Sequence, residues 1–287
     1  MTISELENQI TQLKNDRIHG AHLLSLKALN ILNLAIEESN ADTAEGLLQD
    51  LTNASKAIAT ARPSMVSISN YVNYYLSEIS RSSTDAKHLD TFKHDATIRL
   101  RRLIKYNKEA PLKAAKIATA LIKDGATVII CSYSSTICTM LKIASRTSGK
   151  INVIIMESKW NGFDYGKMSL RELAKNRIPA TIKKRSELDS SRHSIDIAFI
   201  GCDTIFPDGS LINGAPSLLL AKFAETAHIG FYSVGEIVKF DSREQFKTLK
   251  VEPGFDLVPH EMITGIVTEK GIIEPERISD LKYKWIV

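Results

Sequence analysis

The chain is poor in the features that mark secreted, membrane-spanning or metal-binding proteins. Its 287 residues include only Cys131, Cys138 and Cys202, too few for a disulfide framework and without zinc-site spacing. No apolar run approaches the roughly 20 residues that cross a bilayer, and the acidic, helix-like start MTISELENQI does not resemble a signal peptide. We therefore expect a cytoplasmic protein with reduced thiols, no metal and no membrane contact.

Nucleotide-binding motifs and a strong charge bias are also missing. The sequence has no G-x-G-x-x-G and no P-loop, which disfavours a dinucleotide or Walker-type site, and we expect no cofactor. The net charge of +4 permits a phosphorylated small molecule or an RNA-associated partner, but direct DNA binding is not expected. The basic run from Arg99 to Lys116 is typical of a solvated helix face, with contact to RNA or an acidic partner as the alternative.

The first part of the chain has helical periodicity. Apolar residues recur at spacings of three and four, as in Leu23, Leu26, Leu29, Leu32 and Ile36. Pro63 interrupts the pattern, and the polar run from Ser80 to Asp85 predicts a loop before a further helix begins near Asp90. These signals predict a helical domain over residues 1–124.

After Gly125 the period changes to that of short strands alternating with helices. Strands are predicted at 127–130, 153–156, 180–182, 195–200 and 229–234, and helices at about 135–145, 170–176 and 216–227. This alternation predicts a Rossmann-like parallel sheet covered on both faces, over residues 125–287. The predicted fold class is therefore α/β, with an N-terminal helical domain followed by a Rossmann-like domain.

The most informative segment is residues 195–217, IDIAFIGCDTIFPDGSLINGAPS. Its apolar strand ends in Gly201, Cys202 and Asp203, and small anionic ligands often bind where a parallel strand ends. Asp203 has two interpretations, a carboxylate that binds ligand or transfers a proton, and an acidic cap of the following turn.

Several short strings follow the order of motifs in one family: IHGA at 18–21, RPSMV at 62–66, CSYSS at 131–135, ESK at 157–159, GCD at 201–203, DGSLIN at 208–213 and the tail at 255–273. On these strings the chain resembles the translation initiation factor 2B alpha/beta/delta subunit family. The superfamily includes ribose-1,5-bisphosphate and methylthioribose-1-phosphate isomerases. The resemblance implies a ligand cleft between the two domains, a homodimer or hexamer formed through the C-terminal segment, and initiation factor 2 as a candidate partner.

The resemblance also implies catalytic positions. In the isomerases a cysteine after the first Rossmann strand faces an aspartate, and such a pair can donate and remove protons. Asp203 matches that aspartate, but Ser132 stands at the cysteine position. The neighbouring Cys131 is an outside candidate, since adjacent strand residues face opposite sides; its alternative is a small buried residue. Tyr133 instead matches the Gly-Tyr-Ser loop of the initiation-factor subunits.

The ligand-binding positions carried over from the family are His19, Gly20, Ala21, Ser134, Ser135, Lys159, Asn213 and Gly214. Three of them depart from the isomerase pattern, because His19 and Lys159 replace arginines and Gly214 replaces a lysine. Lysine binds phosphate without the bidentate fork of arginine, and a solvated surface lysine is the competing interpretation of Lys159. The competing interpretation of residues 18–21 is a simple loop before the next helix.

These residues predict a binding protein like the regulatory subunits of initiation factor 2B, with a site for a sugar phosphate or nucleotide. The alternative is an aldose-ketose isomerase of the ribose-1,5-bisphosphate type, in which Asp203 moves the proton. A metabolite-responsive regulator outside translation is a third interpretation.

Overall fold

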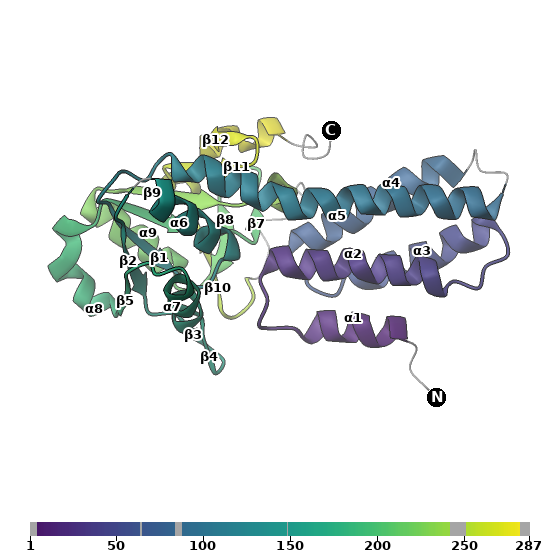
Figure 1. Cartoon of the computed structure of the whole chain (residues 1–287), viewed down its shortest axis with the longest axis horizontal. Helices are drawn as coiled ribbons and strands as arrows, with labels where there is room; N and C mark the ends of the chain where they lie inside the picture. The colour runs from purple at the N-terminus through teal and green to yellow at the C-terminus, as the bar shows by residue number, and fades with distance from the viewer. Residues whose placement is uncertain (1–4, 64, 84–87, 148, 242–250, 282–287) are drawn as a thin grey trace. The chain divides into compact units, whose positions relative to one another are not determined.

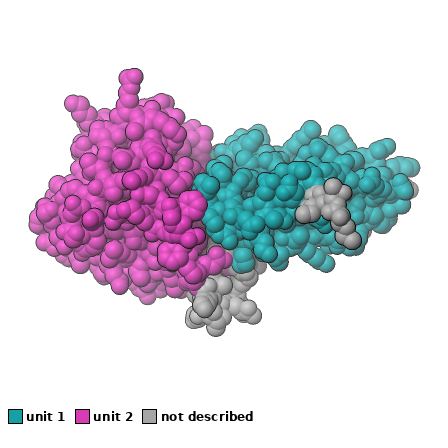
Figure 2. Space-filling view, turned by 90° about the horizontal axis from the view of Figure 1, so that it is seen from below, with its two compact units in different colours: residues 1–109 teal, residues 110–287 magenta. Residues whose placement is uncertain are grey.

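The computed structural model describes residues 5–63, 65–83, 88–147, 149–241 and 251–281. The chain divides into two compact units, unit 1 over residues 1–109 and unit 2 over residues 110–287 (Figure 2). The domain boundary predicted after residue 124 stays a prediction, because the helix that leads into unit 2 runs across the division between the two units.

Unit 1 is helical, as the spacing of its apolar residues predicts (Figure 1). Thr43 begins one helix by accepting a hydrogen bond from the Gly46 N–H at 3.0 Å. The helices are α1 (Glu5–Asn15), α2 (Ala21–Glu38), α3 (Ala44–Ala59), α4 (Val66–Ser83) and α5 (Leu89–Thr119), the last of which continues into unit 2.

The prediction of a loop from Ser80 is wrong as far as Ser83, because α4 continues to that residue. The Ser80 hydroxyl donates to the Leu76 C=O at 2.7 Å, one turn back along the same helix. This bond gives the hydroxyl a partner within α4, so a serine here is accommodated in the helix even though serine favours turns. Asp85, the end of the predicted loop, lies outside the described residues.

Unit 2 is built on a seven-stranded sheet of order β12-β11-β9-β6-β1-β2-β5. All neighbouring strands are parallel except β12, which pairs antiparallel with β11. The strands are β1 (Thr127–Cys131), β2 (Asn152–Met156), β5 (Ala180–Lys183), β6 (Ile197–Ile200), β9 (Gly230–Val234), β11 (Gly265–Thr268) and β12 (Gly271–Ile273). The predicted parallel sheet is confirmed.

Helices cover both faces of this sheet, and successive residues of β1 show the two sides. Val128 and Ile130 pack in one apolar cluster with α6, α7 and the end of α5, whereas Ile129 and Cys131 pack in a second with α9. The helices are α6 (Ser135–Thr147), α7 (Tyr165–Lys175), α8 (Arg185–Leu188) and α9 (Ser217–Ala227). None of the helices in the described part of the chain is both long and apolar enough to cross a bilayer.

Two small antiparallel sheets extend the carboxyl ends of the main strands. One has the order β10-β8-β7, and the other is the hairpin β3-β4. Their strands are β3 (Lys159–Trp160), β4 (Phe163–Asp164), β7 (Thr204–Ile205), β8 (Leu211–Gly214) and β10 (Phe255–Val258). The β8–β10 pairing places residue 214 opposite residue 255, so it joins two motifs far apart in the sequence.

Candidate functional site

A group of polar and small residues gathers where β1, β6 and β8 end. A Cβ atom built on Gly201 would lie 2.9 Å from Ser134 Oγ and 3.3 Å from Asn213 Oδ1, and one built on Gly214 would lie 2.5 Å from Ser132 Oγ. We call Ser132, Ser134, Gly201, Asn213 and Gly214 the edge group. The structure therefore brings together four of the predicted site residues, and glycine at 201 and 214 leaves room for the two serines.

Ser132 combines a strained backbone with a hydroxyl that faces Gly214. Its φ is 58°, in the left-handed region that costs a side-chain-bearing residue about 1–2 kcal/mol. The Ser132 N–H donates to Ser158 Oγ and its C=O accepts from Ser169 Oγ, both at 2.8 Å. The buried Ser132 hydroxyl forms no hydrogen bond with any described residue. Its neighbours thus hold the strained backbone in place while the hydroxyl faces Gly214.

Asn213 is held by a short network that also reaches Cys131. The Asn213 Nδ2 donates to Ser217 Oγ at 2.8 Å, and the Ser217 hydroxyl donates to the Gly214 C=O at 2.7 Å. Cys131 Sγ lies 3.6 Å from Ser217 Oγ. Burial raises the pKa of the Cys131 thiol to about 12, so Cys131 is near the edge group but remains protonated at neutral pH.

Asp203 lies beside a buried ion pair that sequence reasoning missed. The half-buried Asp203 donates its N–H to the Ile212 C=O at 2.8 Å, which joins its turn to β8. Lys239 Nζ and Glu236 Oε2 are 2.6 Å apart and almost fully buried. Burial acts to lower the pKa of Lys239, but Glu236, with smaller contributions from Cys202 and Asp203, raises it above its ordinary value. Asp203 is thus within electrostatic reach of a buried ammonium group.

The remaining predicted residues of unit 2 have local partners. Ser134 accepts a hydrogen bond from the Ile137 N–H at 3.3 Å and so caps α6, whose first residue is Ser135. Lys159 lies on β3, exposed, with its ammonium nitrogen 2.6 Å from Glu157 Oε1. That partner raises the pKa of Lys159. Lys159 therefore already has a counter-ion, and it does not by itself supply a free positive charge.

In unit 1 the predicted residues His19 and Gly20 lie on a loop organised by Asp16, and Ala21 is the first residue of α2. Asp16 Oδ1 accepts hydrogen bonds from the N–H groups of Ile18 and His19, both at 3.0 Å. Gly20 then begins α2 at Ala21 without a side-chain cap. Burial acts to raise the pKa of Asp16, but hydrogen bonds from Lys27 and His19 hold it well below its usual range.

Arg62 is a further cation of this loop that the sequence interpretation did not select as a site residue. Its guanidinium is buried and donates to the Asp16 C=O. In the sequence, Arg62 stands out only as part of the RPSMV string. Its contact with Asp16 could not be predicted, because the two residues are 46 positions apart. His19, Lys27 and Arg62 together surround the loop with basic groups.

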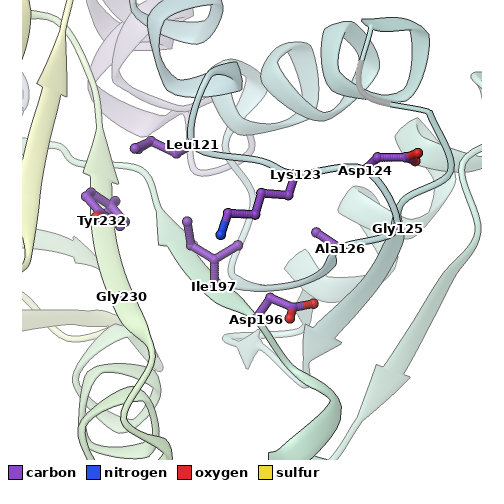
Figure 3. Close-up of a pocket in the computed structure, with 9 residues that line it drawn as sticks. All are labelled: Leu121, Lys123, Asp124, Gly125, Ala126, Asp196, Ile197, Gly230 and Tyr232. Carbon is purple, nitrogen blue, oxygen red and sulfur yellow. The ribbon is translucent and has the colours of Figure 1, made fainter.

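A separate hollow of about 440 Å³ lies at the opposite, amino-terminal edge of the sheet (Figure 3). Asp196, on its rim, accepts a hydrogen bond from the Thr127 N–H at 2.8 Å and so ties β6 to β1. None of the predicted site residues is among its lining residues, which are Leu121, Lys123, Asp124, Gly125, Ala126, Asp196, Ile197, Gly230 and Tyr232. The hollow is distinct from the edge group.

Known proteins resemble the chain over almost its whole length. A putative translation initiation factor eIF-2B subunit 2-like protein of Pyrococcus furiosus is 28% identical, covering 93% of this chain and 96% of that protein. A ribose 1,5-bisphosphate isomerase of the same organism is 24% identical, covering 98% of this chain and 94% of that protein. The crystal structure of translation initiation factor eIF-2B from Pyrococcus horikoshii superposes with a TM-score of 0.79 at 26% identity, covering 96% of this chain and 99% of that one.

These relatives agree with the resemblance inferred from the short strings. One is named as an initiation factor 2B subunit and another as a ribose 1,5-bisphosphate isomerase. The family model described as the initiation factor 2 subunit family matches residues 17–252, which is most of the chain. It extends from the Asp16 loop of unit 1 past the edge group of unit 2. The chain therefore belongs to the initiation factor 2 subunit family.

Proposed function

We propose that the protein is a binding subunit of the regulatory, initiation factor 2B type, and that its edge group binds a phosphorylated ribose compound or nucleotide. The observation that carries this proposal is Ser132, whose backbone is held at a strained φ of 58° by Ser158 and Ser169 and whose hydroxyl faces Gly214. Backbone strain of this kind is typical of binding sites, and a ligand oxygen would give the Ser132 hydroxyl a hydrogen-bond partner.

Backbone groups and hydroxyls, rather than a lysine, supply the phosphate contacts in this proposal. Both α6 and α9 begin beside the edge group, at Ser135 and Ser217, and helix N-termini attract anions. Gly214 stands where the isomerases have lysine, and a side chain there would meet Ser132 Oγ. With glycine at this position, the hydroxyl of Ser132 occupies the space beside the backbone of residue 214.

Binding is favoured over catalysis because no described thiol is suited to proton transfer at neutral pH. Cys131, Cys138 and Cys202 are buried, and burial raises the pKa of each thiol to about 12. At the family's cysteine position the chain has the hydroxyl of Ser132 instead. A hydroxyl is a weaker acid than a thiol, and the side chains that bond the Ser132 backbone, Ser158 and Ser169, are not bases.

Thermal unfolding with ribose-1,5-bisphosphate and ribose 5-phosphate tests the binding proposal. A ligand that binds only the native state raises the melting temperature, and we expect this rise to be lost in Ser132→Ala. Ser190→Ala is the matched control, since Ser190 is exposed and bonds only its own helical turn at Glu187. If neither sugar phosphate nor any nucleotide shifts the melting temperature of the wild type, the proposal is wrong.

An isomerase remains the second candidate because Asp203 lies near the buried Lys239 ammonium, and a relative 24% identical is named as a ribose 1,5-bisphosphate isomerase. In this reading Asp203 removes and returns the substrate proton. Formation of ribulose-1,5-bisphosphate by wild-type protein, abolished in Asp203→Asn, would establish the enzyme and overturn the purely binding role.

The translation role requires a protein partner, for which initiation factor 2 is the candidate. Co-purification of the two proteins, compared in the presence and absence of the sugar phosphate, tests it. Absence of any complex at micromolar concentration would instead favour a metabolite-responsive regulator outside translation.

A further inference from the structure

The hollow at the amino-terminal edge of the sheet has no role in the proposed function. Its volume of about 440 Å³ lies within the range of small-molecule sites. It lies within unit 2 and is formed by three segments, the loop that leads into β1, the start of β6 and strand β9 (Figure 3). The residues of these segments therefore decide what could bind there.

One wall of the hollow is apolar and centres on the ring of Tyr232. A Cβ atom on Gly230 would lie 2.8 Å from Tyr232 Cε2, and one on Gly265 would lie 3.3 Å from Cδ1. Glycine at both positions therefore leaves room for the ring to lie along β9. Leu121 and Ile197 line the hollow as well, so an apolar group that enters would remove these side chains from water.

Two groups of opposite charge line the same hollow. Figure 3 shows the Lys123 side chain reaching toward Ile197, and Lys123 forms no ion pair with any described residue. Asp196 uses Oδ2 to accept the Thr127 N–H at 2.8 Å, and within the described part of the chain its Oδ1 has no hydrogen-bond partner. The hollow therefore offers both an ammonium group and a carboxylate oxygen to a ligand.

The charges of the hollow favour a zwitterion over a phosphate. Its lining carries a net charge of −1, from one lysine, Lys123, and two aspartates, Asp124 and Asp196, and like charges repel a phosphate dianion. A molecule with one anionic and one cationic group can instead pair with Lys123 and Asp196 at once. Asp124 lies against Gly149, which leaves Asp196 as the carboxylate partner. The apolar wall around Tyr232 then requires that the molecule also carry an apolar group.

We propose that the hollow binds a free α-amino acid with an apolar side chain. The carboxylate of the amino acid pairs with the Lys123 ammonium group, its own ammonium group pairs with Asp196 Oδ1, and its side chain covers Ile197 and the Tyr232 ring. Contacts between charged groups of this kind are stronger than neutral hydrogen bonds and fix the orientation of the ligand. The inference goes beyond the proposed function and does not depend on it, because the edge group lies where β1 and β6 end, not where they begin.

Isothermal titration calorimetry with L-leucine tests this inference, because two analogues of leucine each lack one of its charges. Leucinamide lacks the carboxylate, and 4-methylpentanoate lacks the ammonium group. We expect each analogue to bind the wild-type protein about fivefold more weakly than leucine, which is the upper end for an exposed ion pair. Two variants remove the partner charges: Lys123→Met keeps the apolar stem of the lysine, and Asp196→Asn keeps an oxygen that can accept the Thr127 N–H.

Each variant should cancel the effect of one analogue. Lys123→Met should bind leucine about fivefold more weakly than the wild type does but should bind leucinamide equally well. Asp196→Asn should show the same loss for leucine and no loss for 4-methylpentanoate. Lys270→Met is the matched control, since it changes an exposed lysine between β11 and β12 that does not line the hollow, and it should alter none of these affinities.

Two results would overturn the inference. One is an absence of leucine binding to the wild-type protein at millimolar concentration, and the other is equal affinity of the wild type and Lys123→Met for leucine. Lys123→Met should keep the sugar-phosphate response of the wild type, because Lys123 is not part of the edge group. Failure of this inference and failure of the proposed function are therefore distinguished by separate probes.

Discussion

At the scale of single residues, Ser132 links conformational strain to binding. Its neighbours Ser158 and Ser169 bond its backbone and not its hydroxyl, so the strain is stabilised independently of the group that would meet a ligand. Active and binding sites commonly hold such strain because the surrounding structure determines the conformation.

Ser132→Gly should therefore separate stability from binding. Glycine relieves the left-handed φ of 58° while losing some unfolded-state freedom, so we expect a net gain of about 0.5–1 kcal/mol in the free energy of unfolding. Ligand-induced stabilisation should disappear. Urea unfolding measures the first effect and thermal shift the second. Ser145→Gly, within α6, should instead destabilise by about 0.5 kcal/mol; a loss of stability in Ser132→Gly would contradict the strain argument.

The buried thiols give a second residue-scale prediction. Burial raises the pKa of each thiol from the ordinary value of 9.0 to about 12. The neutral thiol therefore contributes to the stability of the folded protein at pH values below the unfolded pKa. This contribution is lost as the pH rises from about 9 to about 12. With no thiolate available at about pH 8, Ellman's reagent should react with none of the three in native protein and with all three after unfolding. Rapid reaction of one thiol in the native state would contradict this prediction, because it would show an accessible, activated cysteine. Such a cysteine would favour the isomerase function.

At the scale of elements, the periodicity of apolar residues predicted the central strands of the parallel sheet. Strand β6 is a fully buried apolar run, and β1 is one from Val128 onward; such runs are visible in sequence. Helix α7 begins at Tyr165, five residues before its predicted start, because Asp164 accepts the Lys167 N–H at 2.9 Å and caps it. That cap is a local signal the apolar pattern does not contain.

The small sheets were not predictable from the same pattern. Strand β8 contains Asn213 and Gly214, residue types that strands disfavour, and its pairing with β10 depends on contacts more than 40 residues away in sequence. The Asn161-Gly162 turn was a usable hairpin signal that the sequence interpretation overlooked. Lys239 and Glu236 were missed because a charged pair in a loop predicts exposure, not burial.

The Lys239–Glu236 pair yields the element-scale prediction. Lys239→Ala leaves the Glu236 carboxylate buried without its ammonium partner, and we expect a loss of about 3–5 kcal/mol in the free energy of unfolding. The double substitution Glu236→Leu with Lys239→Met should recover most of it. Urea denaturation measures both. Lys175→Ala is the control: it removes an exposed ion pair in which Lys175 Nζ lies 2.9 Å from Glu172 Oε2. Its loss should lower the free energy of unfolding by less than about 0.5 kcal/mol. Equal effects at the two sites would contradict the burial argument.

At the scale of the whole molecule, an exposed apolar face supports the proposed homodimer. Leu219 of α9 and Leu257 of β10 are 39% and 44% exposed. Asp256 joins the two elements by accepting the Leu218 N–H at 3.0 Å. The family resemblance assigns dimer contacts to this C-terminal segment.

Leu257→Asp should therefore dissociate the dimer, because it would bury a charge without a partner in the interface. Size-exclusion chromatography with light scattering gives the mass directly, and circular dichroism checks the fold. Leu112→Asp, at a comparably exposed residue of α5 outside the C-terminal segment, is the control and should leave the mass unchanged. A monomeric wild-type protein, or a Leu257→Asp variant that remains dimeric, would remove this segment from the assembly.

The left-handed backbone at residue 132 also limits which sequences evolution can sample there. Valine, isoleucine and threonine strongly resist a φ of 58°, whereas cysteine is nearly the size of serine and fits the same space beside Gly214. The site can thus exchange an oxygen for a sulfur through one base change in a codon, without rebuilding the loop. Selection for or against a reactive thiol at this position acts on a single atom of the protein.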